Sequence, residues 1–135
     1  MEGTTRVLDA SALLAYLNDE PGADLVEEAL VRGSAISAAN LADVLSKLAE
    51  VGEDPKDVIQ NLKRRGLLGG NLVVSALDAD DAVMIASLHR STRARGLSLG
   101  DRACLGLALR LRVPALTADR AWLQLKVAVK IEAIR

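Results

Sequence analysis

Residues 7–15 of the chain read VLDASALLA, and this stretch decides the fold class. Two apolar residues come first, an aspartate follows, and alanine and leucine then recur at helical spacing. Short apolar runs at residues 72–74 and 115–117 likewise lead to an acidic residue and then to a helix-like stretch. Strands that alternate with helices in this way predict an α/β fold with a parallel sheet.

The same patterns extend outward along the whole chain. Apolar spacing, glycines and prolines predict further strands at residues 35–37 and 72–75, and an edge strand at 127–134. Helices are predicted at residues 11–18, 21–32, 41–52, 56–65, 82–95, 101–112 and 120–125. The result is a sheet of about five strands flanked by helices.

The bulk composition is that of a folded, non-membrane protein. At 135 residues the chain has the usual size of one domain, so we expect a single domain over residues 1–135. Half of the residues are hydrophobic, but the longest apolar runs are too short to cross a bilayer. Residues 1–6 lead straight into a strand-like run without the pattern of a secretory signal, so we expect a cytoplasmic protein.

Any bound metal is expected to have oxygen ligands. The chain has one cysteine, Cys104, and one histidine, His89, which excludes an intrachain disulfide and a zinc site of the usual Cys/His kind. Cys104 fits a buried structural thiol and His89 a surface position. The net charge of −1 gives no bulk attraction for nucleic acid, so binding of RNA would need local basic patches and a cation.

Four aspartates occupy positions that suit a common cleft. Asp9 and Asp119 follow predicted strands, and the carboxyl ends of parallel strands are where ligands bind. Asp101 opens a predicted helix, and Asp43 lies on the less apolar side of another, beside Asn40 and Lys47. Taken singly, each has a structural explanation as a helix cap, a loop residue or a solvated side chain.

As a cluster, the four carboxylates predict a divalent cation. Two carboxylates a few ångströms apart repel by about 3 kcal/mol at an effective dielectric constant of about 20, and a cation relieves this repulsion. Oxygen ligands with spare positions for water suit Mg²⁺ or Mn²⁺, which orient a phosphate and activate water. We therefore predict that Asp9, Asp43, Asp101 and Asp119 are metal-binding and catalytic residues.

Four acid-bearing stretches together carry a family resemblance. They are residues 7–15 (VLDASALLA), 36–44 (ISAANLADV), 96–104 (GLSLGDRAC) and 116–119 (LTAD). In this order they resemble the motifs of VapC-like PIN-domain toxins, over nearly the whole chain. The resemblance implies a PIN-like fold, Mg²⁺-dependent endonucleolytic cleavage of RNA, and inhibition by a cognate VapB-like antitoxin encoded beside the toxin.

The resemblance also assigns roles to residues. It gives the metal-binding roles to Asp9, Asp43, Asp101 and Asp119. Ser11 and Thr117 match the family's hydroxyl positions and would support the acids or the substrate by hydrogen bonds. The second motif departs from the family because it carries Asp43 where glutamate is usual, and the shorter side chain leaves open whether it reaches the metal directly or through water.

A homodimer is expected from the apolar stripes of the helices at residues 11–32 and 41–65. These stripes exceed what one face of the sheet covers, and exposed apolar surface usually marks a protein interface.

Two other functional classes fit part of the pattern. A phosphotransfer enzyme with an aspartyl nucleophile also places an aspartate, here Asp9, after its first strand, but the second acid of that pattern is replaced by Ser11. A non-catalytic PIN-like binding module would keep the fold and lose acids, whereas this chain keeps all four. The pattern therefore favours a metal-dependent ribonuclease over both alternatives.

Overall fold

A computed structural model describes residues 3–135, which form a five-stranded parallel sheet. The strand order is β3-β2-β1-β4-β5, and all four pairings are parallel, as the sequence predicts. The strands are β1 (Arg6–Leu8), β2 (Ser34–Ser37), β3 (Leu72–Ser75), β4 (Ala115–Thr117) and β5 (Ile131–Ala133). Strand β1 is therefore central, and the strands that flank it come from distant parts of the chain.

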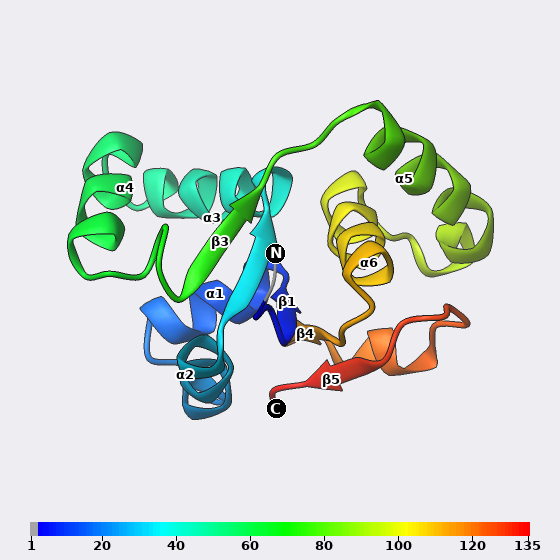
Figure 1. Cartoon of the computed structure of the whole chain (residues 1–135), viewed down its shortest axis with the longest axis horizontal. Coiled ribbons are helices and arrows are strands. Elements are labelled where there is room, and N and C mark those ends of the chain that lie inside the picture. The colour runs from blue at the N-terminus through cyan, green and yellow to red at the C-terminus, as the bar shows by residue number, and fades with distance from the viewer. Residues whose placement is uncertain (1–2) are drawn as a thin grey trace.

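Helices cover both faces of the sheet (Figure 1). They are α1 (Ala10–Leu17), α2 (Ala23–Arg32), α3 (Ala38–Glu50), α4 (Pro55–Arg64), α5 (Ala79–Thr92) and α6 (Leu99–Leu111), with 3₁₀ turns η1 (Arg93–Arg95) and η2 (Arg120–Gln124). Helices α1 to α4 lie on one side, and α6, with α5 packed outside it, lies on the other. Within residues 3–135, no helix combines the length and apolar character needed to cross a membrane.

The alternation of side chains along β1 shows how the two layers arise. Val7 and Leu8 are both fully buried, but Leu8 belongs to the apolar cluster under α1 to α4 and Val7 to the cluster under α5 and α6. Successive side chains of a strand point to opposite faces, so both faces of this sheet need helical cover. The first cluster also contains Ile36 and Leu116 of the neighbouring strands.

Helices start where strands end, and their first polar side chains cap them. Asp9 follows β1 directly and accepts a hydrogen bond from the backbone N–H of Ala12, so it caps α1. Ser37, the last residue of β2, caps α3 by accepting from the backbone N–H of Asn40. The carboxyl ends of the central strands thus carry polar groups that are already engaged in capping.

Two predicted features differ from the structure at the C-terminal end and in the helix pairs. The strand predicted at residues 127–134 is limited to Ile131–Ala133, because its partner β4 offers only three residues for pairing. Much of the apolar surface of α1 to α4 is buried, since these helices pack against one another as well as against the sheet. Leu25 and Val31 of α2 nevertheless stay 46% and 74% exposed, so the uncovered surface on these helices is smaller than predicted.

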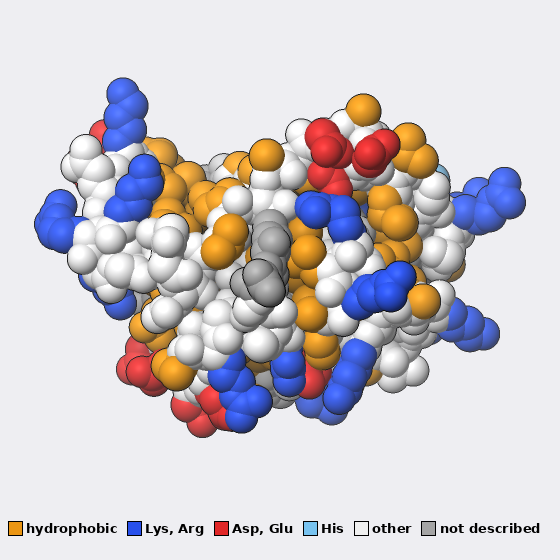
Figure 2. Space-filling view, viewed as in Figure 1, with side chains coloured by type: hydrophobic (Ala, Val, Ile, Leu, Met, Phe, Trp, Pro, Cys, Tyr) orange, Lys and Arg blue, Asp and Glu red, His pale blue; other side chains and the backbone are white. Residues whose placement is uncertain are grey.

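Exposed apolar surface also lies near the start of α5 and α6. Leu77, Val83 and Leu99 are 43%, 67% and 64% exposed. Leu77 and Leu99 line a groove of about 290 Å³ together with Ala82 of α5. Figure 2 shows hydrophobic side chains at the surface in the region of α5. Exposed apolar surface of this kind usually marks a protein interface.

One glycine allows the segment after the C-terminal strand to pack closely against it, and this contact leads to a stability prediction. Gly22 has φ of +95°, and a β-carbon there would lie 2.6 Å from the carbonyl oxygen of Ile134. Gly52 has φ of +94° and open space around it. We expect Gly52→Ala to lower the free energy of unfolding by about 1–2 kcal/mol through backbone strain, and Gly22→Ala by about 1–3 kcal/mol more through overlap. Urea unfolding measures both, and equal losses would contradict the proposed contact.

Candidate active site

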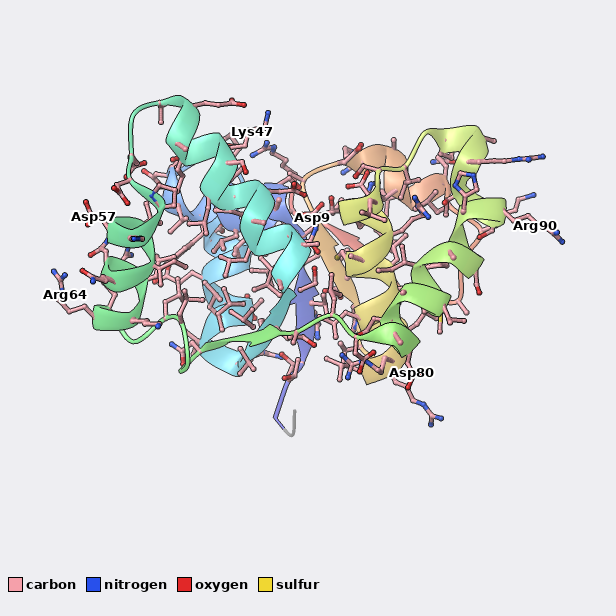
Figure 3. The ribbon with its side chains drawn as sticks, turned by 90° about the horizontal axis from the view of Figure 1, so that it is seen from above. Asp9, Lys47, Asp57, Arg64, Asp80 and Arg90 are labelled. Carbon is pink, nitrogen blue, oxygen red and sulfur yellow. The ribbon has the colours of Figure 1, made fainter. Side chains whose placement is uncertain are left out.

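The four predicted acids line one cleft at the carboxyl edge of the sheet. Its volume is about 320 Å³, and its walls also include Ser11, Lys47, Glu50 and Trp122. Figure 3 shows Asp9 between α3 and α6, with Lys47 on α3. The elements that bring the acids together are β1 with α1, α3, α6, and the turn after β4. The structure thus places all four sequence-predicted acids on the wall of one cleft.

Asp9 is the buried centre of the cleft. Its side chain lies at the end of the central strand, and the residue is only 4% exposed. Oδ1 accepts hydrogen bonds from Ser11 Oγ at 2.7 Å and from the backbone N–H of Ala12 at 2.8 Å. Oδ2 accepts from Thr117 Oγ1 at 2.6 Å. Three donors therefore fix the carboxylate in one orientation, and Oδ2, with a single donor, keeps a lone pair for a further ligand.

Burial changes the acidity of Asp9. Loss of water around the carboxylate raises the pKa of Asp9 above its ordinary value of 3.8, and the nearby charge of Asp101 raises it further. The hydrogen bonds from Thr117, Ser11 and Ala12 act in the opposite direction but do not cancel the effect of burial. The ionised form of Asp9 is therefore costly until a positive charge enters the cleft.

Ser11 and Thr117 link Asp9 to the turn that carries Asp119. Ser11 Oγ accepts from the backbone N–H of Ala118 at 2.9 Å, and Thr117 Oγ1 accepts from the backbone N–H of Asp119 at 3.0 Å. Each hydroxyl then has its own proton free to donate to Asp9. The two hydroxyls predicted as supporting residues thus hold the acid of β1 and the turn after β4 in a fixed relation.

Asp101 sits in the first turn of α6 rather than capping it. Ser98 is the cap, and the two residues form a reciprocal pair in which Ser98 Oγ accepts from the N–H of Asp101 and Asp101 Oδ2 accepts from the N–H of Ser98. Asp101 therefore takes part in the capping box as its third residue, while Ser98 is the cap itself. The carboxylate is partly buried and faces the cleft.

Asp43 and Asp119 form the more open part of the cleft. Asp43 is exposed on α3, and Oδ2 would lie 2.5 Å from a β-carbon on Gly100, so its carboxylate reaches across to the start of α6. Asp119 caps η2 by accepting from the backbone N–H of Ala121 at 2.9 Å. Asp43 is thus solvated and Asp119 has a local capping role, and both side chains also line the cleft.

Carboxylate oxygens are suitable ligands for a hard divalent cation, but in this structure the carboxylates do not lie close enough together to bind one. Among residues 3–135, no three histidine, cysteine, aspartate or glutamate side chains lie close enough together to form a metal-binding group by themselves. All four carboxylates nevertheless line the same small cleft, and oxygen ligands are those that Mg²⁺ and Mn²⁺ prefer. A cation there would draw the carboxylates inward.

The burial of Asp9 argues against a role as a nucleophile. A nucleophilic carboxylate needs a free oxygen with open access to the reacting phosphorus or carbon. Both oxygens of Asp9 accept hydrogen bonds, and the residue is almost fully buried. The arrangement suits an anchored metal ligand, as the sequence analysis favours.

Two residues near the acids have roles that the sequence analysis missed. Asn40, placed on the solvated side of its helix, is 1% exposed and donates from Nδ2 to the carbonyl oxygen of Gly100. Glu50 also lines the cleft; Lys47 lies one turn beyond Asp43 on α3, and Glu50 lies two turns beyond it. Residues 43, 47 and 50 are spaced so that they lie on one side of a helix, and this spacing could have predicted that they line the same cleft. No sequence pattern near Asn40 predicts its distant partner, Gly100.

Cys104 lies behind the cleft and takes no part in its surface. It is fully buried on α6, one turn after Asp101, which confirms the predicted structural thiol. Burial raises the pKa of Cys104 well above its usual value, and the charges of Asp9 and Asp101 act in the same direction. The thiol is therefore kept protonated and inert.

Comparisons with known proteins agree with this architecture. The family model of the PIN domain matches residues 6–128. No curated protein matches the chain. Among solved structures, a chain of a toxin-antitoxin complex from Klebsiella pneumoniae is 14% identical with a TM-score of 0.70, covering 97% of this chain and 98% of that one.

Two further solved structures share the fold at low identity. A chain of DNA-bound VapBC from Salmonella typhimurium is 16% identical with a TM-score of 0.71, covering 98% of this chain and 99% of that one. A chain of FitAcB from Neisseria gonorrhoeae is 15% identical with a TM-score of 0.71, covering 96% and 98%. Such likenesses establish the fold, and the family model covers nearly the whole chain. The chain therefore belongs to the PIN domain family.

Proposed function

We propose that this protein is a cytoplasmic endoribonuclease toxin that uses Mg²⁺ or Mn²⁺ and is neutralised by a cognate VapB-like antitoxin. The observation that carries the proposal is that Asp9, Asp43, Asp101 and Asp119 line one cleft, with Asp9 buried at its base. A binding module without catalysis has no need for a buried carboxylate that is costly to ionise. Membership of the PIN domain family supports the same choice.

In this proposal, the residues of the chain hold the cation in position and supply the negative charge that binds it. A divalent cation, when bound, supplies activation of water and neutralisation of phosphate charge. Asp9, Asp43, Asp101 and Asp119 would hold it, with Asp43 binding directly or through water. Ser11 and Thr117 hold Asp9 in place through hydrogen bonds of 2.7 and 2.6 Å. This support keeps the carboxylate in the orientation that a cation requires.

RNA would be recognised mainly through its backbone and shape. Trp122 is 3% exposed and contributes to the core, so it offers no platform for stacking bases. Lys47 is the basic side chain on the cleft wall and is placed to meet a phosphate next to the metal site. In contrast, Arg64 and Arg90 project away from Asp9 at opposite ends of the molecule (Figure 3).

Two protein partners complete the proposal. The similar chains from Klebsiella pneumoniae and Salmonella typhimurium come from a toxin-antitoxin complex and from VapBC, which supports an antitoxin as partner of this chain. The exposed apolar groove lined by Leu77, Ala82 and Leu99 supports a homodimer through the α5–α6 side. The proposed dimer therefore leaves the acidic cleft open to RNA and to the antitoxin.

Asp101→Asn should fold normally and lose RNA cleavage. Asparagine keeps an oxygen that accepts from the N–H of Ser98, so the start of α6 survives, but the charge needed for metal binding is gone. New 5′ ends in total RNA, mapped after induction of the wild type and of the variant, measure the effect. Equal cleavage by both would remove Asp101 from the site.

The metal dependence provides the matching control for that experiment. Purified wild-type protein should cleave the mapped RNA with Mg²⁺ or Mn²⁺ and stop when EDTA is added. Ca²⁺ should not restore cleavage, because it prefers longer and looser coordination at about 2.3–2.6 Å. Cleavage at the full rate in EDTA would reject the proposed metal site.

Asp9→Asn should stabilise the metal-free protein as the pH rises. The pKa of Asp9 is raised in the folded state, so the folded protein binds this proton more tightly than the unfolded chain, and wild-type stability falls as Asp9 ionises. In EDTA, the stability of Asp9→Asn relative to wild type should therefore increase from about pH 4 to about pH 7. Urea unfolding at several pH values measures this difference, and a pH-independent difference would contradict the buried charge.

The antitoxin is expected to place a cationic side chain among the acids. Arginine or lysine would pair with Asp9 and Asp101 in place of the metal. Calorimetry at two salt concentrations can compare antitoxin binding to wild type and to the double variant Asp9→Asn, Asp101→Asn. We expect weaker binding and a smaller salt dependence for the double variant. Equal affinity and equal salt dependence would reject contact with the cleft but not the partnership itself.

A further inference from the structure

A buried asparagine joins the two helices that carry Asp43 and Asp101. Asn40 lies one turn before Asp43 on α3 and is almost completely buried. Its Nδ2 donates a hydrogen bond of 3.0 Å to the backbone carbonyl of Gly100, which is 60 residues away and directly precedes Asp101 on α6. This bond ties α3 to α6 across the floor of the cleft.

The chemistry of its neighbours fixes the orientation of the Asn40 amide. Ser37 Oγ accepts from the backbone N–H of Asn40 at 3.1 Å and therefore donates its own proton to Oδ1 of Asn40 at 2.6 Å. The carbonyl of Gly100 can only accept, so it must face Nδ2. The position thus needs one acceptor and one donor on a short side chain, which a carboxylate or an aliphatic side chain cannot provide.

Gly100 complements Asn40 by leaving space for Asp43. A β-carbon on Gly100 would lie 2.5 Å from Oδ2 of Asp43 and 3.6 Å from Nδ2 of Asn40. Gly100 lies in the first turn of α6 and is not one of the glycines with positive φ. The missing side chain therefore serves the close approach of Asp43 rather than an unusual backbone conformation.

We propose that Asn40 is a positioning residue which, with Gly100, sets the separation of Asp43 from Asp101 and so the affinity of the cleft for a divalent cation. The inference rests on the metal site of the proposed function. Asn40 is not among the residues that line the cleft. Residues that hold metal ligands in place typically change metal affinity by about 10- to 100-fold when replaced.

Calorimetric titration with MnCl₂ tests this role. Asn40→Ala removes the bond to Gly100, and we expect Mn²⁺ to bind at least tenfold more weakly than to wild type. Gly100→Ala keeps the bond and displaces the Asp43 carboxylate, which is the flexible end of a side chain. We expect Mn²⁺ to bind Gly100→Ala more weakly too, while its stability stays the same or rises because alanine favours a helix.

Ser34→Ala is the matched control. Ser34 is also buried, and its hydroxyl also donates to a backbone carbonyl, that of Ala29 at 2.8 Å. Ser34 begins β2 at the opposite edge of the sheet from the acids. The loss of a comparable hydrogen bond should therefore destabilise Ser34→Ala as it does Asn40→Ala and leave Mn²⁺ affinity unchanged. Wild-type Mn²⁺ affinity in Asn40→Ala would overturn the proposal, whatever the affinity of Gly100→Ala.

Backbone hydrogen exchange separates a failure of this inference from a failure of the metal site. If wild type binds no Mn²⁺, the proposed function fails at its metal site, and the Asn40 bridge is still testable. The amides of Asp101 and Arg102 should then exchange faster in Asn40→Ala than in wild type and Ser34→Ala, because the first turn of α6 loses its tie to α3. Equal exchange in all three proteins would reject the bridge.

Discussion

The carboxylate of Asp9 is removed from water at the end of the central strand, and the surrounding structure follows from the need to hold it there. Burying a carboxylate is costly unless it is hydrogen-bonded or paired with positive charge. Ser11 and Ala12 supply two donors from the start of α1, and Thr117 supplies the third from β4. A local turn and the neighbouring strand are therefore both required before Asp9 has its full set of donors.

The order of the strands in the sheet brings the other acids close to Asp9. Because β1 lies between β2 and β4, the segments that leave those two strands start on either side of Asp9. Helix α3 leaves β2 and brings Asp43, and the turn after β4 brings Asp119. Helix α6 contacts β1, β2, β4 and α3, so Asp101 completes the cleft from the other layer. The acids meet because of topology, although they come from four distant parts of the chain.

The sequence was sufficient where the signal was local and insufficient where a partner lay far along the chain. Asp9 and Asp119 were predictable because they lie one and two residues after an apolar strand, and the parallel sheet was predictable from the repeated strand–helix pattern. Asn40 was assigned to the solvated face because a polar residue on an amphipathic helix usually belongs there, whereas its partner is a backbone carbonyl on α6. The extent of β5 differs from the prediction for a related reason, since the length of a strand depends on its neighbour.

Because Cys104 is buried, the reactivity of its thiol reports how often this part of the protein opens. Thiol reagents attack the thiolate, and this group is fully buried with a raised pKa. Alkylation therefore requires α6 to separate from the sheet, which also separates Asp101 from Asp9. The rate of alkylation measures how often the acidic cleft comes apart in the native protein, and a ligand that bridges the cleft must slow it. The chain's single cysteine thus connects the mobility of one helix with the integrity of the site.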